Sequence, residues 1–136
     1  MVKQQLSVLY HCVYSTNYHL VFVTKYRRRC ITREMLERLK ETAQRILARW
    51  HGEIMEFNGE ADHIHLLVSI PPKVAPSALV NNLKTVTARL IRKEFAEHLA
   101  RFFRKPVFWS RSYCIITCGG APLSVIKQYI EQQGEE

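Results

Sequence analysis

Two histidines stand two residues apart inside an apolar stretch, in the segment EADHIHLLVSIPP at residues 60–72. Side chains alternate between the two faces of a strand, so we expect His63 and His65 to share one face while Ile64 packs toward the core. Their Cα atoms would lie roughly 6.5–7 Å apart, and two imidazoles leaning across that gap can share one metal ion. The spacing alone also fits an ordinary polar strand face. The same alternation places Asp62 on the opposite face, as a turn residue rather than a ligand.

A second group of candidate residues lies near the end of the chain. The segment SVIKQYIEQQ at residues 124–133 predicts a helix in which Tyr129 and Gln133, four residues apart, lie one above the other on the same face. A tyrosine in such a helix is most often an aromatic residue at the edge of the core. Beside a metal ion, its phenol, with an ordinary pKa of about 10, becomes a candidate nucleophile, and Gln133 offers a carbonyl oxygen as a third ligand.

The elements that must position these residues follow from hydrophobic periodicity and turn signals. β-Branched and aromatic residues predict a central strand at 17–24, and apolar residues at intervals of three and four predict a helix at 32–50 with Thr32 as its N-cap. A hairpin should follow, with its turn at Asn58-Gly59. The other predicted elements are strands at 53–59 and 62–70, a helix at about 77–100, a strand at 112–118, and a helix from Pro122 to about Gln133.

The predicted order of strand, helix, strand, strand, helix, strand and helix indicates the fold class. Its first six elements match the α+β ferredoxin-like, or split βαβ, plan, an antiparallel sheet with helices mainly on one face. A C-terminal helix is added to this βαββαβ unit. We expect residues 1–136 to form a single domain in which residues 1–16 are a loose N-terminal arm. The fold hosts many functions and does not decide the activity.

The composition favours a nucleic-acid-binding protein without establishing one. The 136 residues carry a formal net charge of +8, which attracts polyanions, although many basic proteins bind no nucleic acid. The four cysteines lack the paired spacing of zinc motifs and are expected to be reduced and mostly buried. The polar start MVKQQ is no signal peptide, and no apolar run could span a membrane. We therefore expect a cytoplasmic protein without a membrane partner, associated with the nucleoid when bound to DNA.

Three blocks of the sequence, in order, resemble one known family. ADHIHLLVSIPP resembles the His-hydrophobe-His (HUH) motif of single-strand DNA nucleases. With YHLVFVTKYRR before it and FWSRSYCIITCGGAPLSVIKQYIEQQ after it, the chain is similar to the single-tyrosine transposases of small bacterial and archaeal insertion sequences, the IS200/IS605-like family. The likeness covers nearly all of residues 17–133.

This resemblance implies a metal-dependent endonuclease and strand transferase that acts on single-stranded DNA. Tyr129 would attack a scissile phosphate to give a 5′-phosphotyrosine intermediate and a free 3′-hydroxyl, while His63, His65 and Gln133 would hold a divalent ion, Mg²⁺ or Mn²⁺. Two imidazoles suit zinc or manganese better than magnesium, so the physiological ion stays open. Family members recognise hairpins at the element ends and work as homodimers whose active sites are shared between subunits.

The resemblance also makes several basic and aromatic residues candidate DNA contacts. The candidates for phosphate contacts are Lys25, Arg27, Arg28, Lys84, Arg89 and Arg92, and those for stacking on unpaired bases are Tyr26 and Trp109. For each charged residue the alternative is a solvated surface position, and for Trp109 it is the core. Two other functions stay open: a domesticated or inactive protein of this fold that binds hairpin or single-stranded DNA, and an RNA-binding ferredoxin-like module.

Overall fold

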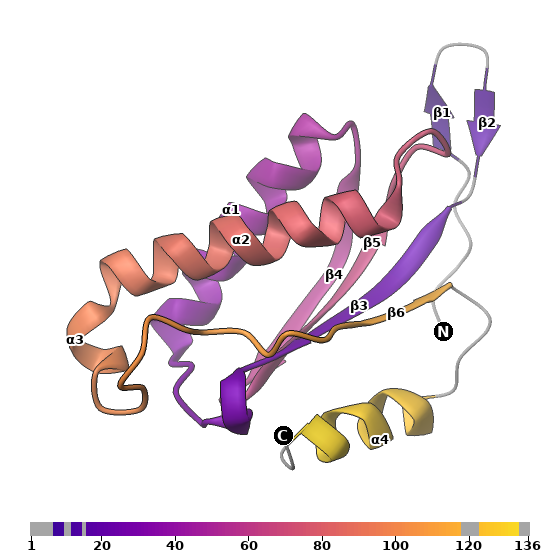
Figure 1. The fold of residues 1–136 in the computed structure, drawn as a ribbon. Coiled ribbons are helices and arrows are strands. Elements are labelled where there is room, and N and C mark those ends of the chain that lie inside the picture. Colours follow the sequence, from indigo (N-terminus) through magenta and orange to yellow (C-terminus); the bar gives the residue numbers. More distant parts are fainter. Residues whose placement is uncertain (1–6, 10–11, 15, 118–122, 134–136) are drawn as a thin grey trace.

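A computed structural model describes residues 7–9, 12–14, 16–117 and 123–133 of the chain. Its centre is an antiparallel sheet with the strand order β4–β5–β3–β6, which confirms the predicted ferredoxin-like α+β fold (Figure 1). The strands of this sheet are β3 (Asn17–Val23), β4 (Glu53–Glu60), β5 (His63–Ser69) and β6 (Cys114–Thr117). The helices are α1 (Arg33–Arg49), α2 (Pro76–Glu94), α3 (Ala96–Leu99), α4 (Leu123–Gln133) and the short 3₁₀ helix η1 (Lys25–Arg27).

The sheet divides the hydrophobic core into two unequal parts. Alternate side chains of β3 and β5, among them Phe22 and Leu66, form the main core beneath α1 and α2. On the other face of β3, Val21 and Val23 pack against Ile126 of α4. Figure 1 shows this arrangement, with α1 and α2 on one side of the sheet and α4 on the other. The C-terminal helix therefore covers the face that the other two long helices leave open.

The described part of the N-terminal segment consists of two short paired strands. Strands β1 (Ser7–Leu9) and β2 (Cys12–Tyr14) pair antiparallel as a separate two-stranded sheet. Each strand has only three residues, too few for an alternation of apolar and polar side chains to be recognised in the sequence.

Helix α1 begins as predicted, because the Thr32 hydroxyl accepts a hydrogen bond from the backbone N–H of Met35 at 3.2 Å. The second predicted helix is interrupted after α2. Phe95, with φ of −121° and ψ of 33°, separates α2 from the short α3, whose Leu99 is buried in the main core. The Gly119-Gly120 turn, Pro122 and Cys118 lie outside the described residues.

The hairpin between β4 and β5 turns later than predicted. Asn58 and Gly59 lie inside β4, and the turn is formed by Ala61 and Asp62. Gly59 lies where α1 approaches the sheet, because a Cβ atom there would lie 2.5 Å from a side-chain methyl carbon of Leu36 in α1. The turn thus falls directly before the two histidines and brings Asp62 into their surroundings.

Candidate active site

The two histidines share one face of β5, as the alternation predicted. His63 pairs with Val23 and His65 with Val21, the two residues of β3 that contact α4. Ile64 between them is buried in the main core, whereas both histidines are only partly buried. The strand therefore keeps its apolar face in the core and presents both imidazoles beneath α4.

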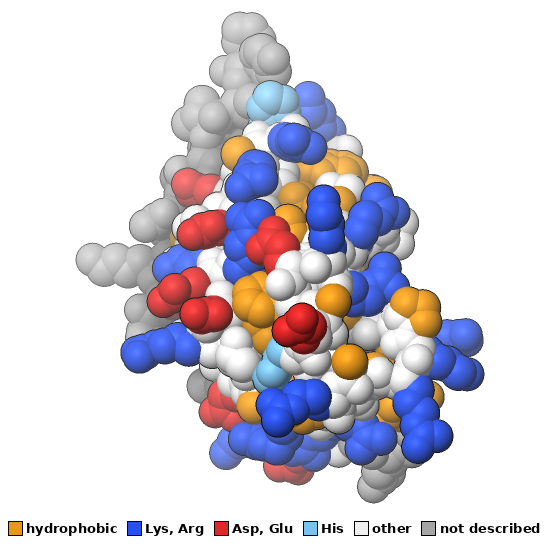
Figure 2. All heavy atoms as spheres, turned by 90° about the vertical axis from the view of Figure 1, so that its left-hand side faces the viewer, with side chains coloured by type: hydrophobic (Ala, Val, Ile, Leu, Met, Phe, Trp, Pro, Cys, Tyr) orange, Lys and Arg blue, Asp and Glu red, His pale blue; other side chains and the backbone are white. Residues whose placement is uncertain are grey.

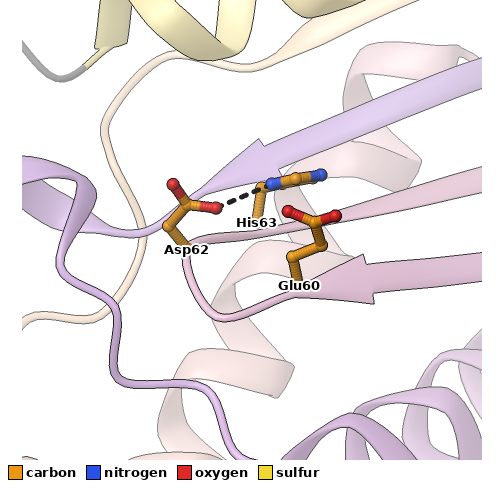
Figure 3. A group of neighbouring side chains, drawn as sticks. All are labelled: Glu60, Asp62 and His63. Carbon is orange, nitrogen blue, oxygen red and sulfur yellow. Dashed lines mark hydrogen bonds and ion pairs between the residues drawn. The ribbon is translucent and has the colours of Figure 1, made fainter.

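Asp62 does not point away from the histidines, contrary to the prediction from strand alternation. It lies in the turn, where alternation does not apply, and its Oδ1 accepts a hydrogen bond from Nδ1 of His63 at 2.8 Å (Figure 3). Its Oδ2 accepts a second bond from Nε of Arg27 at 2.9 Å. Burial raises the pKa of Asp62, but the bonds from His63 and Arg27 outweigh it and hold the pKa below its usual value. The ionised carboxylate fixes His63 with its Nε2 left for another partner.

Arg27 is brought to Asp62 by an unusual backbone turn. Tyr26 and Arg27 have positive φ angles of 56° and 53°, and the turn is anchored by the Thr24 hydroxyl, which donates to the carbonyl of Arg28 at 2.7 Å. Arg27 also approaches α4, with Nη1 3.5 Å from the carbonyl oxygen of Glu131. The basic turn after β3 is thus joined both to the histidine strand and to the C-terminal helix.

Glu60, at the end of β4, completes a group with the chemistry of a metal site. One ligand atom from each of Glu60, Asp62 and His63 lies within 4.8 Å of the others (Figure 3). Carboxylate oxygens together with an imidazole nitrogen suit Mn²⁺, Zn²⁺ or Mg²⁺. These residues fit the divalent ion that the sequence predicted. The sequence reasoning did not select Glu60 and took Asp62 for a turn residue rather than a ligand, because their approach to His63 depends on where the hairpin turns.

His65 is held by a third histidine, His19, which the sequence reasoning did not select. Nδ1 of His19 and Nε2 of His65 are 2.9 Å apart. Burial, followed by the proximity of His19, lowers the pKa of His65. A neutral imidazole is the form that binds a metal ion, so the surroundings of His65 favour its ligand state.

Tyr129 and Gln133 lie on α4 and contact the segment that precedes β6. Within the one chain, the hydroxyls of Tyr129 and Ser112 are 3.0 Å apart, and the Ser112 hydroxyl donates to Oε1 of Gln133 at 2.7 Å. Ser110 donates to the same oxygen at 3.3 Å. The two residues share a helix face, as predicted, and both contact Ser112 in the segment before β6.

The histidines line a cleft of about 290 Å³ between the sheet and α4. From the sheet side it is bounded by His63, His65, Glu60 and Asp62, and from the turn after β3 by Arg27. The α4 residues that line this cleft are Ile126, Lys127, Ile130 and Glu131. The helix that bears Tyr129 therefore forms one wall of the histidine cleft.

Besides Arg27, which is bonded to Asp62, three more of the candidate DNA contacts form hydrogen bonds within the chain. The Lys84 ammonium donates to the carbonyls of Ser110, Arg111 and Ser112 at 2.6, 2.9 and 3.1 Å. Arg92 donates to the carbonyl of Pro106. Both side chains thus hold the segment that leads into β6. The sequence does not indicate this role, because the bonded residues come together only in the folded chain.

Trp109 is the third, and it belongs to the core. Its indole is 7% exposed, donates from Nε1 to the Thr87 hydroxyl at 2.9 Å, and packs against Phe22 and Phe108. The buried ring supports the core alternative over stacking on a base. Tyr26, by contrast, is 48% exposed, with Lys25 and Arg28 close to its ring, so it keeps an aromatic face available to a ligand.

Several cations gather at the end of the molecule that carries α3. Figure 2 shows this end, with many Lys and Arg side chains spread over it. A cleft of about 490 Å³ there is lined by no acidic residue, and its basic lining residues are Arg89, Arg92, Lys93, Arg104 and Lys105. Such a surface attracts phosphate groups. It lies along α2, away from the α4 side of the sheet.

Comparison with solved structures places this fold among transposases. A crystal structure of a candidate transposase from Deinococcus radiodurans R1 superposes with a TM-score of 0.84 at 28% identity, covering 93% of this chain and 97% of that one. The REP-associated tyrosine transposase bound to a REP hairpin shares the fold, with a TM-score of 0.56 at 11% identity over 92% of this chain and 69% of that one.

Sequence comparison defines the family. The family described as "Transposase IS200 like" matches residues 12–133. The transposase for insertion sequence element IS200 of Salmonella typhimurium is 35% identical over 94% of this chain and 83% of its own length. The ISDra2 transposase TnpA of Deinococcus radiodurans is 31% identical over 91% of this chain and 88% of its own. The chain belongs to the IS200-like transposase family, as the resemblance of its motifs predicted. None of the described helices is long and apolar enough to cross a membrane.

Proposed function

We propose that this transposase cleaves and rejoins single-stranded DNA through Tyr129, with a divalent ion held by His63 and His65. One observation carries the proposal: α4, the helix that bears Tyr129, packs on the sheet face that presents the two histidines. A tyrosine needs a metal ion or a base nearby to become reactive, because its phenol ordinarily stays protonated at neutral pH.

Each residue has a defined task in this reaction. The Tyr129 oxygen forms a bond to the scissile phosphorus, and the bond from phosphorus to the 3′ oxygen breaks, which leaves a 5′-phosphotyrosine and a free 3′-hydroxyl. When bound, the divalent ion supplies positive charge to the non-bridging oxygens and orients the phosphate. Nε2 of His63, the ring nitrogen that takes no part in the bond to Asp62, would bind the ion. Attack of the 3′-hydroxyl on the phosphotyrosine reverses the step and rejoins DNA.

The position of Gln133 supports a site shared between two subunits. Within one chain its amide oxygen is bonded to Ser110 and Ser112, so it does not serve His63 of the same chain in this arrangement. In a homodimer, the α4 of a second subunit can bring Tyr129 and Gln133 to the histidine cleft. Glu60 supplies an alternative oxygen ligand from within the chain.

Hairpin DNA at the element ends is the proposed substrate. The related tyrosine transposase of the same fold is bound to a REP hairpin, and this chain has the charge that such a partner requires. Arg89 is exposed and lines the 490 Å³ cleft along α2, which suits contacts to a DNA backbone. Tyr26 is placed to stack on an unpaired base, worth about 1–3 kcal/mol.

Cleavage of single-stranded DNA tests the proposal. Oligonucleotides from the flanks of the gene are incubated with the protein and Mn²⁺ or Mg²⁺, and covalent protein–DNA adducts are separated on denaturing gels. We expect adducts that require the ion and disappear in His63→Ala and in Tyr129→Phe. Binding of the hairpin by all three proteins without any adduct would instead favour a domesticated DNA-binding protein.

Complementation between two inactive variants tests the shared site. A shared site predicts that mixing Tyr129→Phe with a His63→Ala, His65→Ala double variant restores cleavage, because one mixed site contains both intact halves. Failure to restore activity, with mixed dimers demonstrated by tagged subunits, would place Tyr129 and the histidines of a single chain in one site.

A further inference from the structure

His19 is a polar residue on the site face for which the proposed chemistry has no role. It stands on β3 opposite Leu67, diagonally across from His65, which pairs with Val21. Diagonal neighbours on antiparallel strands come within reach when the side chains are long. The contact between the two histidines is therefore a direct result of the register of β3 and β5.

The geometry of this contact is that of a hydrogen bond between ring edges. Nδ1 of His19 and Nε2 of His65 are 2.9 Å apart, while the ring centroids are 5.1 Å apart and the ring planes lie 29° from parallel. The facing nitrogens are much closer than the ring centres, so the rings meet edge to edge, not face to face. One proton lies between these two nitrogens.

The position of that proton decides whether His65 can bind a metal ion. If His19 donates it, the neutral His65 carries its own proton on Nδ1, and both of its nitrogens are occupied. If Nε2 of His65 donates it, Nδ1 of His65 keeps a free lone pair. Only the second arrangement leaves His65 a ligand without breaking the bond to His19.

We propose that His19 is a positioning residue of the metal centre, which accepts the Nε2 proton of His65 and thereby makes Nδ1 of His65 the ligand atom. This inference rests on the proposed function, in which His65 holds the ion. Asp62 has the matching role at His63, where it accepts the Nδ1 proton and leaves Nε2. The two neighbouring histidines thus have opposite tautomers, each selected by one partner: the carboxylate of the turn for His63 and an imidazole of β3 for His65.

The tautomers can be measured directly in the metal-free protein by long-range ¹H–¹⁵N NMR of its histidine side chains. We expect the proton on Nε2 of His65 and on Nδ1 of His63, with His65 losing its preference in His19→Phe. Addition of Zn²⁺, a diamagnetic probe, should shift Nδ1 of His65 and leave its Nε2 proton in place. A proton on Nδ1 of His65 in the free protein, or Zn²⁺ bound through Nε2, would overturn the inference.

Metal affinity gives an independent measurement. Mn²⁺ titrations followed by electron paramagnetic resonance should show affinity about 10- to 100-fold weaker in His19→Phe, as is usual when a partner of a ligand is lost. His19→Asn should restore most of it, because the amide oxygen accepts a hydrogen bond near the place of Nδ1. His51→Asn, at an exposed position beyond α1 whose φ of 60° asparagine tolerates, is the control for loss of a histidine elsewhere. Unchanged affinity in His19→Phe would refute the role, and equal loss in Phe and Asn variants would reduce His19 to a packing residue.

The two experiments separate this inference from the proposed function. If the wild-type protein bound neither ion, the proposed function would fail, yet the tautomer of His65 in the metal-free protein would still be measurable. If the wild-type protein bound Mn²⁺ and cleaved DNA while His65 carried its proton on Nδ1, only the role of His19 would be wrong.

Discussion

Lys84 offers the sharpest distinction between a structural cation and a DNA contact. Its ammonium donates to three consecutive carbonyls, those of residues 110–112, and this segment holds the α4 residues Tyr129 and Gln133 through Ser110 and Ser112. Lys84→Met keeps most of the aliphatic stem and removes all three bonds. We expect the variant to lose stability and to loosen the packing of α4.

The expected loss follows from the three bonds. Hydrogen bonds to a charged group contribute about 1.5–3 kcal/mol each, but these three share one partly exposed ammonium that water would otherwise solvate. We therefore expect a decrease of about 2–4 kcal/mol in the free energy of unfolding, below the full sum. Urea unfolding followed by circular dichroism measures it, and hydrogen exchange of the α4 amides reports the loosening.

Arg89→Met is the matched control, because Arg89 lies on the same helix, is exposed and lines the 490 Å³ cleft along α2. It should leave stability within about 0.5 kcal/mol of the wild type. It should also reduce the slope of log affinity for hairpin DNA against log salt by about one. The reasoning is refuted if Lys84→Met shows the smaller slope with unchanged stability, since Lys84 would then be a phosphate contact.

Three further outcomes follow from local contacts. Ser112→Ala removes the hydroxyl bonded to Tyr129, so faster hydrogen exchange in α4 is expected while β5 stays protected; equal rates in both proteins would contradict this. Cys30 is buried, and burial raises its pKa to about 11. Its alkylation by iodoacetamide in the folded protein should therefore be slow at pH 8 and should accelerate toward pH 11. Rapid reaction at pH 8, with the fold intact, would be inconsistent with that environment. Gly52→Ala would place a Cβ atom 2.6 Å from the backbone oxygen of Ser69, so urea unfolding should show a loss of about 1–3 kcal/mol, and a neutral substitution would be unexpected.

The fold was largely predictable because its long elements carry strong periodic signals. The apolar run of β3, the stripe and N-cap of α1, and the alternation around Ile64 each indicated the correct element. The hairpin turn was misplaced because Asn58-Gly59 is a turn signal that here serves the close approach of α1. Tertiary packing decided where the turn between β4 and β5 lies, and local sequence rules carry no information about that packing.

For the candidate site, the sequence predicted only which residues share a face of their own strand or helix. Strand alternation placed His63 and His65 on one face of β5, and helical spacing placed Tyr129 and Gln133 on one face of α4. Contacts between segments distant in sequence were not accessible, such as the bond between His19 and His65, 46 residues apart. The same limit explains why Lys84 was taken for a DNA contact. Its charge is visible in the sequence, but its three carbonyl partners lie on a distant segment.

Mapping the covalent adduct tests the central proposal most directly. The product of a cleavage reaction with single-stranded DNA from the flanks is digested with trypsin, and the peptide that carries nucleotides is identified by mass spectrometry. Cleavage after Lys127 releases residues 128–136, in which Tyr129 is the one tyrosine. We predict nucleotides joined through a 5′ phosphate to Tyr129. Nucleotides on any other residue, or cleaved DNA that is not attached to protein, would contradict the proposed mechanism.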